Sequence, residues 1–155
     1  SDLEDFAYGF SLTEGIVTAG WYPVELNAAM HVAVRELFGN GTWSKSRAIG
    51  REAAKIDFGG IYRVLLRAVP HATLWDRVGL AWNQYNSGGV SQWEVVEPGV
   101  AVGAVREVSG YNDGLWESVA GRLETMLERS GVRARTVTLV ETASTFVRAE
   151  VLWME

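Results

Sequence analysis

The side chains that could carry acid–base or metal chemistry are few in this sequence and far apart. The 155 residues include two histidines, His31 and His71, and no cysteine. Lack of cysteine excludes disulfides, thiolate catalysis, iron–sulfur clusters and cysteine-ligated zinc. The histidines are forty residues apart, and neither belongs to an HExxH pattern. The sequence therefore predicts no metal site and no cofactor.

Two glutamates near the C-terminus are candidates for proton transfer. Glu141 and Glu150 lie in a predicted hairpin, where they could be cross-strand neighbours. If both faced a closed cavity, one of them would hold its proton and could act as a proton carrier. The other interpretation is that they face water or pair with Arg148 or Arg135. The chain also has no nucleophile–base pair, no metal motif, no GxSxG elbow and no P-loop, so the sequence leans against an enzyme without deciding the question.

Aromatic rings are the more unusual feature of the composition. The chain has seven Trp, five Tyr and five Phe. Aromatic side chains bury large areas in protein cores, and they also line ligand cavities and interfaces. The sequence leaves both interpretations open, a filled core and a lined cavity.

The bulk composition predicts one globular domain spanning residues 1–155, with residues 1–5 frayed. Apolar residues make up 48% and charged residues 21%, and the net charge is −5. That charge, with no cluster of basic residues, argues against nucleic-acid binding. No apolar run approaches the roughly 18 residues of a membrane span, and the start lacks the pattern of a retained signal peptide. We therefore expect a cytoplasmic protein with no membrane span.

The first two thirds of the chain has helical periodicity. Residues 6–19 fit either a strand or a short helix. Pro23 marks a helix start, and His31 lies opposite the apolar stripe of that helix, so we expect His31 to be solvated. Gly50 inside the next helix indicates close helix packing. The predicted helices run from Pro23 to the Gly39-Asn40-Gly41 stop, over Ser44–Ile56, over Ile61–Val69 and over Thr73–Tyr85.

The remainder of the chain alternates strands with one more helix. Asn112 or Asp113 can cap that helix, which Ser130-Gly131 ends. The predicted elements are a hairpin of Val90–Glu97 and Val100–Val108, a helix over Asp113–Glu128, and a hairpin of Arg135–Thr142 and Thr145–Trp153. The order helices–hairpin–helix–hairpin predicts an α+β fold, with N-terminal helices packed on a four- to five-stranded antiparallel sheet.

Two sets of residues resemble known families. The first set resembles a group of bacterial, notably myxobacterial, proteins of unknown function; it comprises Trp21-Tyr22-Pro23, Gly50-Arg51-Glu52-Ala53-Ala54, Ile61-Tyr62-Arg63 and Leu80-Ala81-Trp82. The tail is similar to the end of 4-vinyl-reductase-type sensor domains; it comprises Gly121, Glu124, Gly131, Val137, Glu141-Thr142 and Glu150-Val151-Leu152-Trp153. Those domains are related in fold to haem nitric-oxide sensors and Golgi transport-particle subunits. The resemblance is a pattern of spacings over roughly residues 20–153, without one diagnostic motif.

The resemblance implies a ligand-binding domain, often dimeric and often joined to signalling modules. Relatives hold a small hydrophobic molecule, an acyl chain or a haem between helices and sheet. Many relatives carry cysteines near the start of the last helix and in the final hairpin, in some cases for metal binding. This chain has no cysteine, so the resemblance does not imply metal sensing by that route. Haem-binding relatives use a proximal histidine on a helix, and neither His31 nor His71 lies on a predicted apolar stripe.

The favoured function is accordingly a non-catalytic sensory domain that binds a small hydrophobic molecule. Its predicted binding residues are Tyr62, Arg63, Trp75, Trp82, Tyr85, Trp93 and Trp116, with Tyr62 and Arg63 supplying the polar contacts. The alternative is an interaction or scaffold domain with a filled aromatic core, and its partner would be a second copy or a signalling protein. A ligand binder needs open space beside the rings, whereas a scaffold packs them solid.

Overall fold

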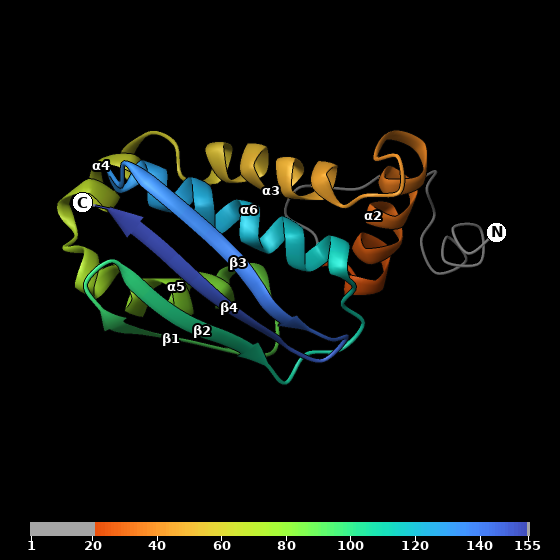
Figure 1. The fold of residues 1–155 in the computed structure, drawn as a ribbon. Coiled ribbons are helices and arrows are strands. Elements are labelled where there is room, and N and C mark those ends of the chain that lie inside the picture. The colour runs from red at the N-terminus through yellow and green to blue at the C-terminus, as the bar shows by residue number, and fades with distance from the viewer. Residues whose placement is uncertain (1–20, 155) are drawn as a thin grey trace.

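Helices and a single antiparallel sheet form the two sides of the protein in this computed structural model, which describes residues 21–154 (Figure 1). The predictions for residues 1–5 and 6–19 lie outside the described residues. The elements are α2 Val24–Phe38, α3 Ser44–Asp57, α4 Ile61–Ala68, α5 His71–Tyr85, β1 Val90–Glu97, β2 Val100–Arg106, α6 Asp113–Arg129, β3 Ala134–Thr142 and β4 Val147–Met154. This order confirms the predicted α+β class.

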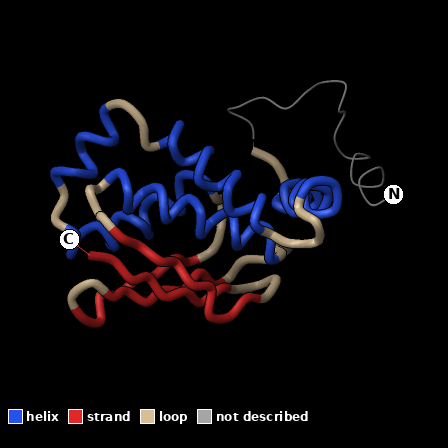
Figure 2. Tube along the Cα trace, turned by 45° about the horizontal axis from the view of Figure 1, so that its top comes forward, coloured by secondary structure: helices blue, strands red, loops and turns tan. Residues whose placement is uncertain are grey.

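The sheet has four strands in the described part of the chain, in the order β1-β2-β4-β3, with antiparallel neighbours. Helices cover one of its faces (Figure 2). On β4 buried and less buried residues alternate, with Val147, Ala149, Val151 and Trp153 buried toward the helices. This period of two matches a sheet that is covered on one face only.

Close backbone approach joins α3 to α6, which lie side by side (Figure 1). A Cβ atom added at Gly50 would lie 2.0 Å from the carbonyl oxygen of Ser118, and one added at Gly121 would lie 2.1 Å from that of Arg47. Neither position has space for a side chain, so the close packing predicted at Gly50 is confirmed.

Ion pairs fix the register of the same two helices. Arg47 pairs with Glu117 and with Glu124, and Arg51 pairs with Glu124, whose side chain is buried. Arg47 also donates from Nη1 to the carbonyl oxygen of Val137 on β3, at 2.9 Å. The hydrogen bond to Glu124 raises the pKa of Arg51. Arg47 therefore ties α3 to both α6 and the sheet.

The predicted boundaries hold except at a few ends. Helix α5 begins at His71 rather than Thr73, because the Pro70 carbonyl accepts the first backbone bonds. Strand β2 ends at Arg106, because Glu107 adopts a positive φ of 61° that extended backbone does not allow. Strand β4 begins at Val147 rather than Thr145. Over residues 21–154, the helices lack the length and apolarity needed to cross a membrane.

Candidate ligand-binding cavity

A cavity of about 330 Å³ lies where α2, α3, α5 and α6 meet the strands β1 and β2. Trp82, Tyr85, Trp93 and Tyr111 are the aromatic residues at its wall, beside Phe58. Aliphatic side chains from several helices complete most of the lining. The volume falls at the lower end of the range of about 300–1,000 Å³ that is common for small-molecule sites.

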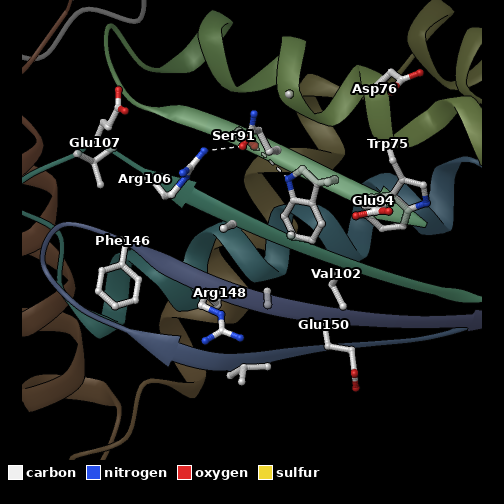
Figure 3. A pocket seen from close by; sticks show the side chains of 18 of the residues that line it. Trp75, Asp76, Ser91, Glu94, Val102, Arg106, Glu107, Phe146, Arg148 and Glu150 are labelled. Atoms are coloured by element: carbon white, nitrogen blue, oxygen red, sulfur yellow. Dashed lines mark hydrogen bonds between the residues drawn. The ribbon is translucent and has the colours of Figure 1, made fainter. Parts of the chain in front are cut away.

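A larger hollow of about 1280 Å³ lies along the strands and the edge of β1 (Figure 3). Its rim includes the exposed charged side chains Glu94, Arg106 and Arg148. Val102 and Glu150, which line it as well, lie in register on β2 and β4. Because this hollow is bordered by solvated charges, we place the candidate site in the smaller cavity between the layers.

Two groups of stacked rings flank the smaller cavity. In one, the Trp82, Tyr111 and Trp116 rings have centroids 4.2 to 6.5 Å apart. In the other, Trp75 stacks on Trp93 at 5.4 Å and contacts Trp153 at 5.3 Å. The Trp93 ring also lies over Gly103, where an added Cβ would come within 2.2 Å of it. An indole ring on β1 therefore makes a close approach to the backbone of β2 at this glycine.

The seven predicted binding residues fall in different places. Trp82, Tyr85 and Trp93 line the cavity together. Trp116 is fully buried and donates from Nε1 to the Ala143 carbonyl oxygen at 2.8 Å. The remaining three lie elsewhere: Trp75 borders the larger hollow, Arg63 is exposed on α4, and the side chain of Tyr62 is outside the described part of the structure. A binding role for these residues stays a prediction.

His31 is the residue that the sequence reasoning placed wrongly. It is only 4% exposed, it lines the cavity, and its Nδ1 lies 2.8 Å from Ser46 Oγ. Gly114 lets α6 approach α2 closely at this point, because an added Cβ there would lie 2.8 Å from His31 Cβ. Burial lowers the pKa of His31. The serine and the glycine are distant in sequence, so the periodicity of α2 carried no sign of them.

Three other polar residues at the cavity, Tyr111, Asn86 and Arg122, already have partners. The Tyr111 hydroxyl donates to Asn86 Oδ1 at 2.8 Å, and Asn86 Nδ2 donates to the Trp82 carbonyl oxygen at 3.1 Å. Burial raises the pKa of Tyr111 to about 12, so its phenol stays protonated. Arg122 is paired with Asp57 and lies 5.4 Å from the centroid of the Tyr85 ring.

The two glutamates considered for proton transfer do not form a pair. Glu141 binds Arg148, with Oε2 3.2 Å from Nη1, as the second interpretation expected. Glu150 lies opposite Thr138 on one side and Val102 on the other. Over the described residues, no three His, Asp or Glu side chains gather in a group that could hold a metal ion.

Solved structures of similar fold are H-NOX proteins. One, from work on the mechanism of H-NOX activation, is 14% identical with a TM-score of 0.62, and the match covers 99% of this chain and 85% of the other. A variant of T. tengcongensis H-NOX is 12% identical, with a TM-score of 0.62 over 99% and 93% of the two chains. An S. oneidensis H-NOX protein in an Fe(II)NO ligation state is 10% identical, with a TM-score of 0.61 over 98% and 88%. No protein-family model and no curated protein matches the chain. The chain therefore has an H-NOX-like fold.

Proposed function

We propose that this chain is a non-catalytic sensory domain that binds a small, largely hydrophobic molecule between its helices and its sheet. The observation that carries the proposal is the 330 Å³ cavity beside Trp82, Tyr85 and Trp93. Mostly apolar walls with a few polar groups are typical of small-molecule sites. The H-NOX-like fold supports a sensory role, since the solved structures are of ligand-binding proteins by their descriptions.

Haem is the ligand that the fold suggests first, and the cavity residues do not fit it. Proteins hold haem iron through His, Cys, Met or Tyr. His31 could supply one imidazole and Met126 a thioether, but the protonated Tyr111 phenol is a poor ligand. The acidic groups of a haem need cationic partners, and Arg122, the cation among the described lining residues, is already paired with Asp57. A cavity at the lower end of the usual range favours a smaller molecule.

The scaffold alternative also has support. Trp75 and Trp116 are 2% and 0% exposed, so part of the aromatic set is packed solid. The sheet face opposite the helices exposes Val102, Leu152 and Met154. A scaffold would use such a face against a second copy or a signalling protein, and it would gain no stability from small molecules.

Ligand-induced stabilisation separates the two functions. Native mass spectrometry of protein purified from cells should show a bound small molecule, and added ethylbenzene or naphthalene should quench Trp fluorescence and raise Tm. Ala81→Phe, which places a ring in the cavity, should abolish the rise in Tm. Ala68→Phe, a matched change on an exposed position of α4, should leave it intact. If the native mass spectra show only bare polypeptide and neither compound changes Tm, the ligand proposal is wrong.

The wider setting belongs to the same proposal. We propose that residues 1–155 form a single cytoplasmic domain of bacterial type. Its partner would be a signalling protein or a second copy, which would respond to whether the cavity holds a ligand. The kinship with 4-vinyl-reductase-type sensors is part of this proposal and rests on the spacings in the tail.

A further inference from the structure

We infer that the cavity selects ligands bearing a hydrogen-bond acceptor, such as a carbonyl oxygen on a small aromatic ring, and that His31 Nε2–H is the donor that recognises it. The inference rests on the proposed function, because it names the chemical class of molecule that the cavity would take.

The first step is the position of His31. The side chain comes from α2, packs against α6 at Gly114, and lines the cavity while remaining 4% exposed. Nδ1 is bonded to Ser46, whereas Nε2 has no hydrogen-bond partner among the described residues. Nε2 is not among the buried side-chain atoms that lack a partner, so a molecule in the cavity can reach it and accept its hydrogen bond in place of water.

The second step is the tautomer of the imidazole. Ser46 is 1% exposed, and its hydroxyl has His31 Nδ1 as its hydrogen-bond partner among the described residues. If Nδ1 carried the proton, the serine hydroxyl hydrogen would be left buried without an acceptor. If the serine donates to Nδ1, both groups are satisfied, and the neutral ring carries its proton on Nε2. Burial, which lowers the pKa of His31, keeps the ring in this neutral form.

The third step concerns which other polar groups at the cavity already have hydrogen-bond or ion-pair partners. Tyr111 already donates to Asn86, and Arg122 is paired with Asp57. Ser118 also lines the cavity, one turn beyond Gly114, and its hydroxyl has no hydrogen-bond partner among the described residues. A carbonyl oxygen has two lone pairs, so it could accept from His31 and from Ser118 together. The donors that remain to a ligand thus match an acceptor on an otherwise apolar molecule.

Nitrogen-15 NMR of the imidazoles tests the tautomer in the unmodified protein. The chain has two histidines, so a His71→Gln variant assigns both sets of signals. We expect His31 to be neutral near neutral pH with its proton on Nε2. A ring protonated on Nδ1, or on both nitrogens, would overturn the inference without affecting the cavity itself.

Binding of acetophenone and ethylbenzene tests the selection. The two molecules have nearly the same shape, but only acetophenone has an acceptor oxygen. One hydrogen bond of ordinary strength predicts about five-fold tighter binding of acetophenone by the wild-type protein, measured by Trp quenching. His31→Phe should remove that preference while still binding ethylbenzene, and Ser46→Ala, which keeps the ring but frees Nδ1, should reduce it.

The outcomes separate this inference from the proposed function. Equal binding of both compounds by the wild-type protein would refute the role of His31 and leave the ligand-binding proposal intact. Binding of neither compound, with no change in Tm, would count against both. If His31→Phe does not fold, the wild-type comparison and the Ser46→Ala variant still decide the matter.

Discussion

At the scale of single residues, the buried His31 should make the protein sensitive to acid. Its pKa is lowered from the ordinary 6.5 by burial, so the unfolded chain takes up a proton at a higher pH than the folded protein does. Stability contributed by the neutral ring is therefore complete above about pH 6.5 and is lost as the pH falls below it, until the folded pKa is passed. Within that pH window, the free energy of unfolding should change by up to about 1.4 kcal/mol per pH unit.

Urea unfolding of three proteins from about pH 8 to about pH 5 checks this dependence. The pH slope of the wild-type protein should be shared by His71→Gln and reduced in His31→Gln. All three proteins have the same carboxylates, so the difference between variants isolates the imidazole. A slope unchanged by His31→Gln would show that another group is responsible.

Glu124 is the second residue with a large expected effect. It is 7% exposed and accepts from both Arg47 and Arg51, and Arg51 is itself partly exposed. Glu124→Gln keeps the shape but leaves two cations facing a neutral amide, so we expect a loss of about 2–3 kcal/mol in the free energy of unfolding. Glu128→Gln, at a more exposed pair on the same helix, should cost less than about 1 kcal/mol. If denaturant titrations show equal losses for Glu124→Gln and Glu128→Gln, the larger contribution expected of the buried Glu124 pair is contradicted.

At the scale of elements, the contact between α3 and α6 depends on its glycines. An alanine Cβ at Gly50 would overlap the backbone of Ser118, which cannot rotate away. We expect Gly50→Ala to cost about 2–3 kcal/mol, although alanine favours the helix by about 1 kcal/mol. Gly88→Ala is the control, because a Cβ there meets nothing within 4 Å. Thermal unfolding of both variants checks the prediction, and a stabilised Gly50→Ala would refute it.

Local signals in the sequence predicted where the helices and strands lie, but they did not predict which face of each element is buried. The helix start at Pro23, the helix cap at Asn112 and the helix end at Ser130-Gly131 are short-range features, and each has its expected structure. Helix α2 behaves differently. Its apolar residues Met30 and Leu37 are 47% and 73% exposed, whereas His31 is buried.

Tertiary partners explain that difference. The face of α2 that packs inward contains Leu26, Ala28 and His31, because Ser46 bonds to the imidazole and Gly114 lets α6 come close to His31. Those partners lie 15 and more positions away, beyond the reach of any helical period. For the same reason the sequence predicted aromatic lining in general terms, yet it could not separate Trp82, at the cavity, from Trp116, in the packed core.

At the scale of the whole molecule, the cavity lies between elements that differ greatly in how much of their surface is buried and in how many interactions hold them. Helix α6 is buried over most of its length, and β4 pairs with a strand on each side. Helix α2 is held by fewer interactions, among them the bond from Asn112 Nδ2 to the Ala28 carbonyl oxygen at 2.9 Å. A ligand in the cavity would touch both α2 and α6, so its binding energy would also stabilise α2, which has fewer contacts than α6.

Hydrogen exchange should show this coupling. Amides in α2 should exchange faster than those in α6, because elements with few buried contacts open locally at low cost. Saturating acetophenone should slow exchange in α2 and in the second half of α5, where Ala81 and Trp82 line the cavity. Helix α4, which contributes no residue to that lining, is the internal control. Protection confined to β2 and β4 would instead place the ligand in the larger hollow along the sheet. The smaller cavity between the helices and the strands would then have no part in binding.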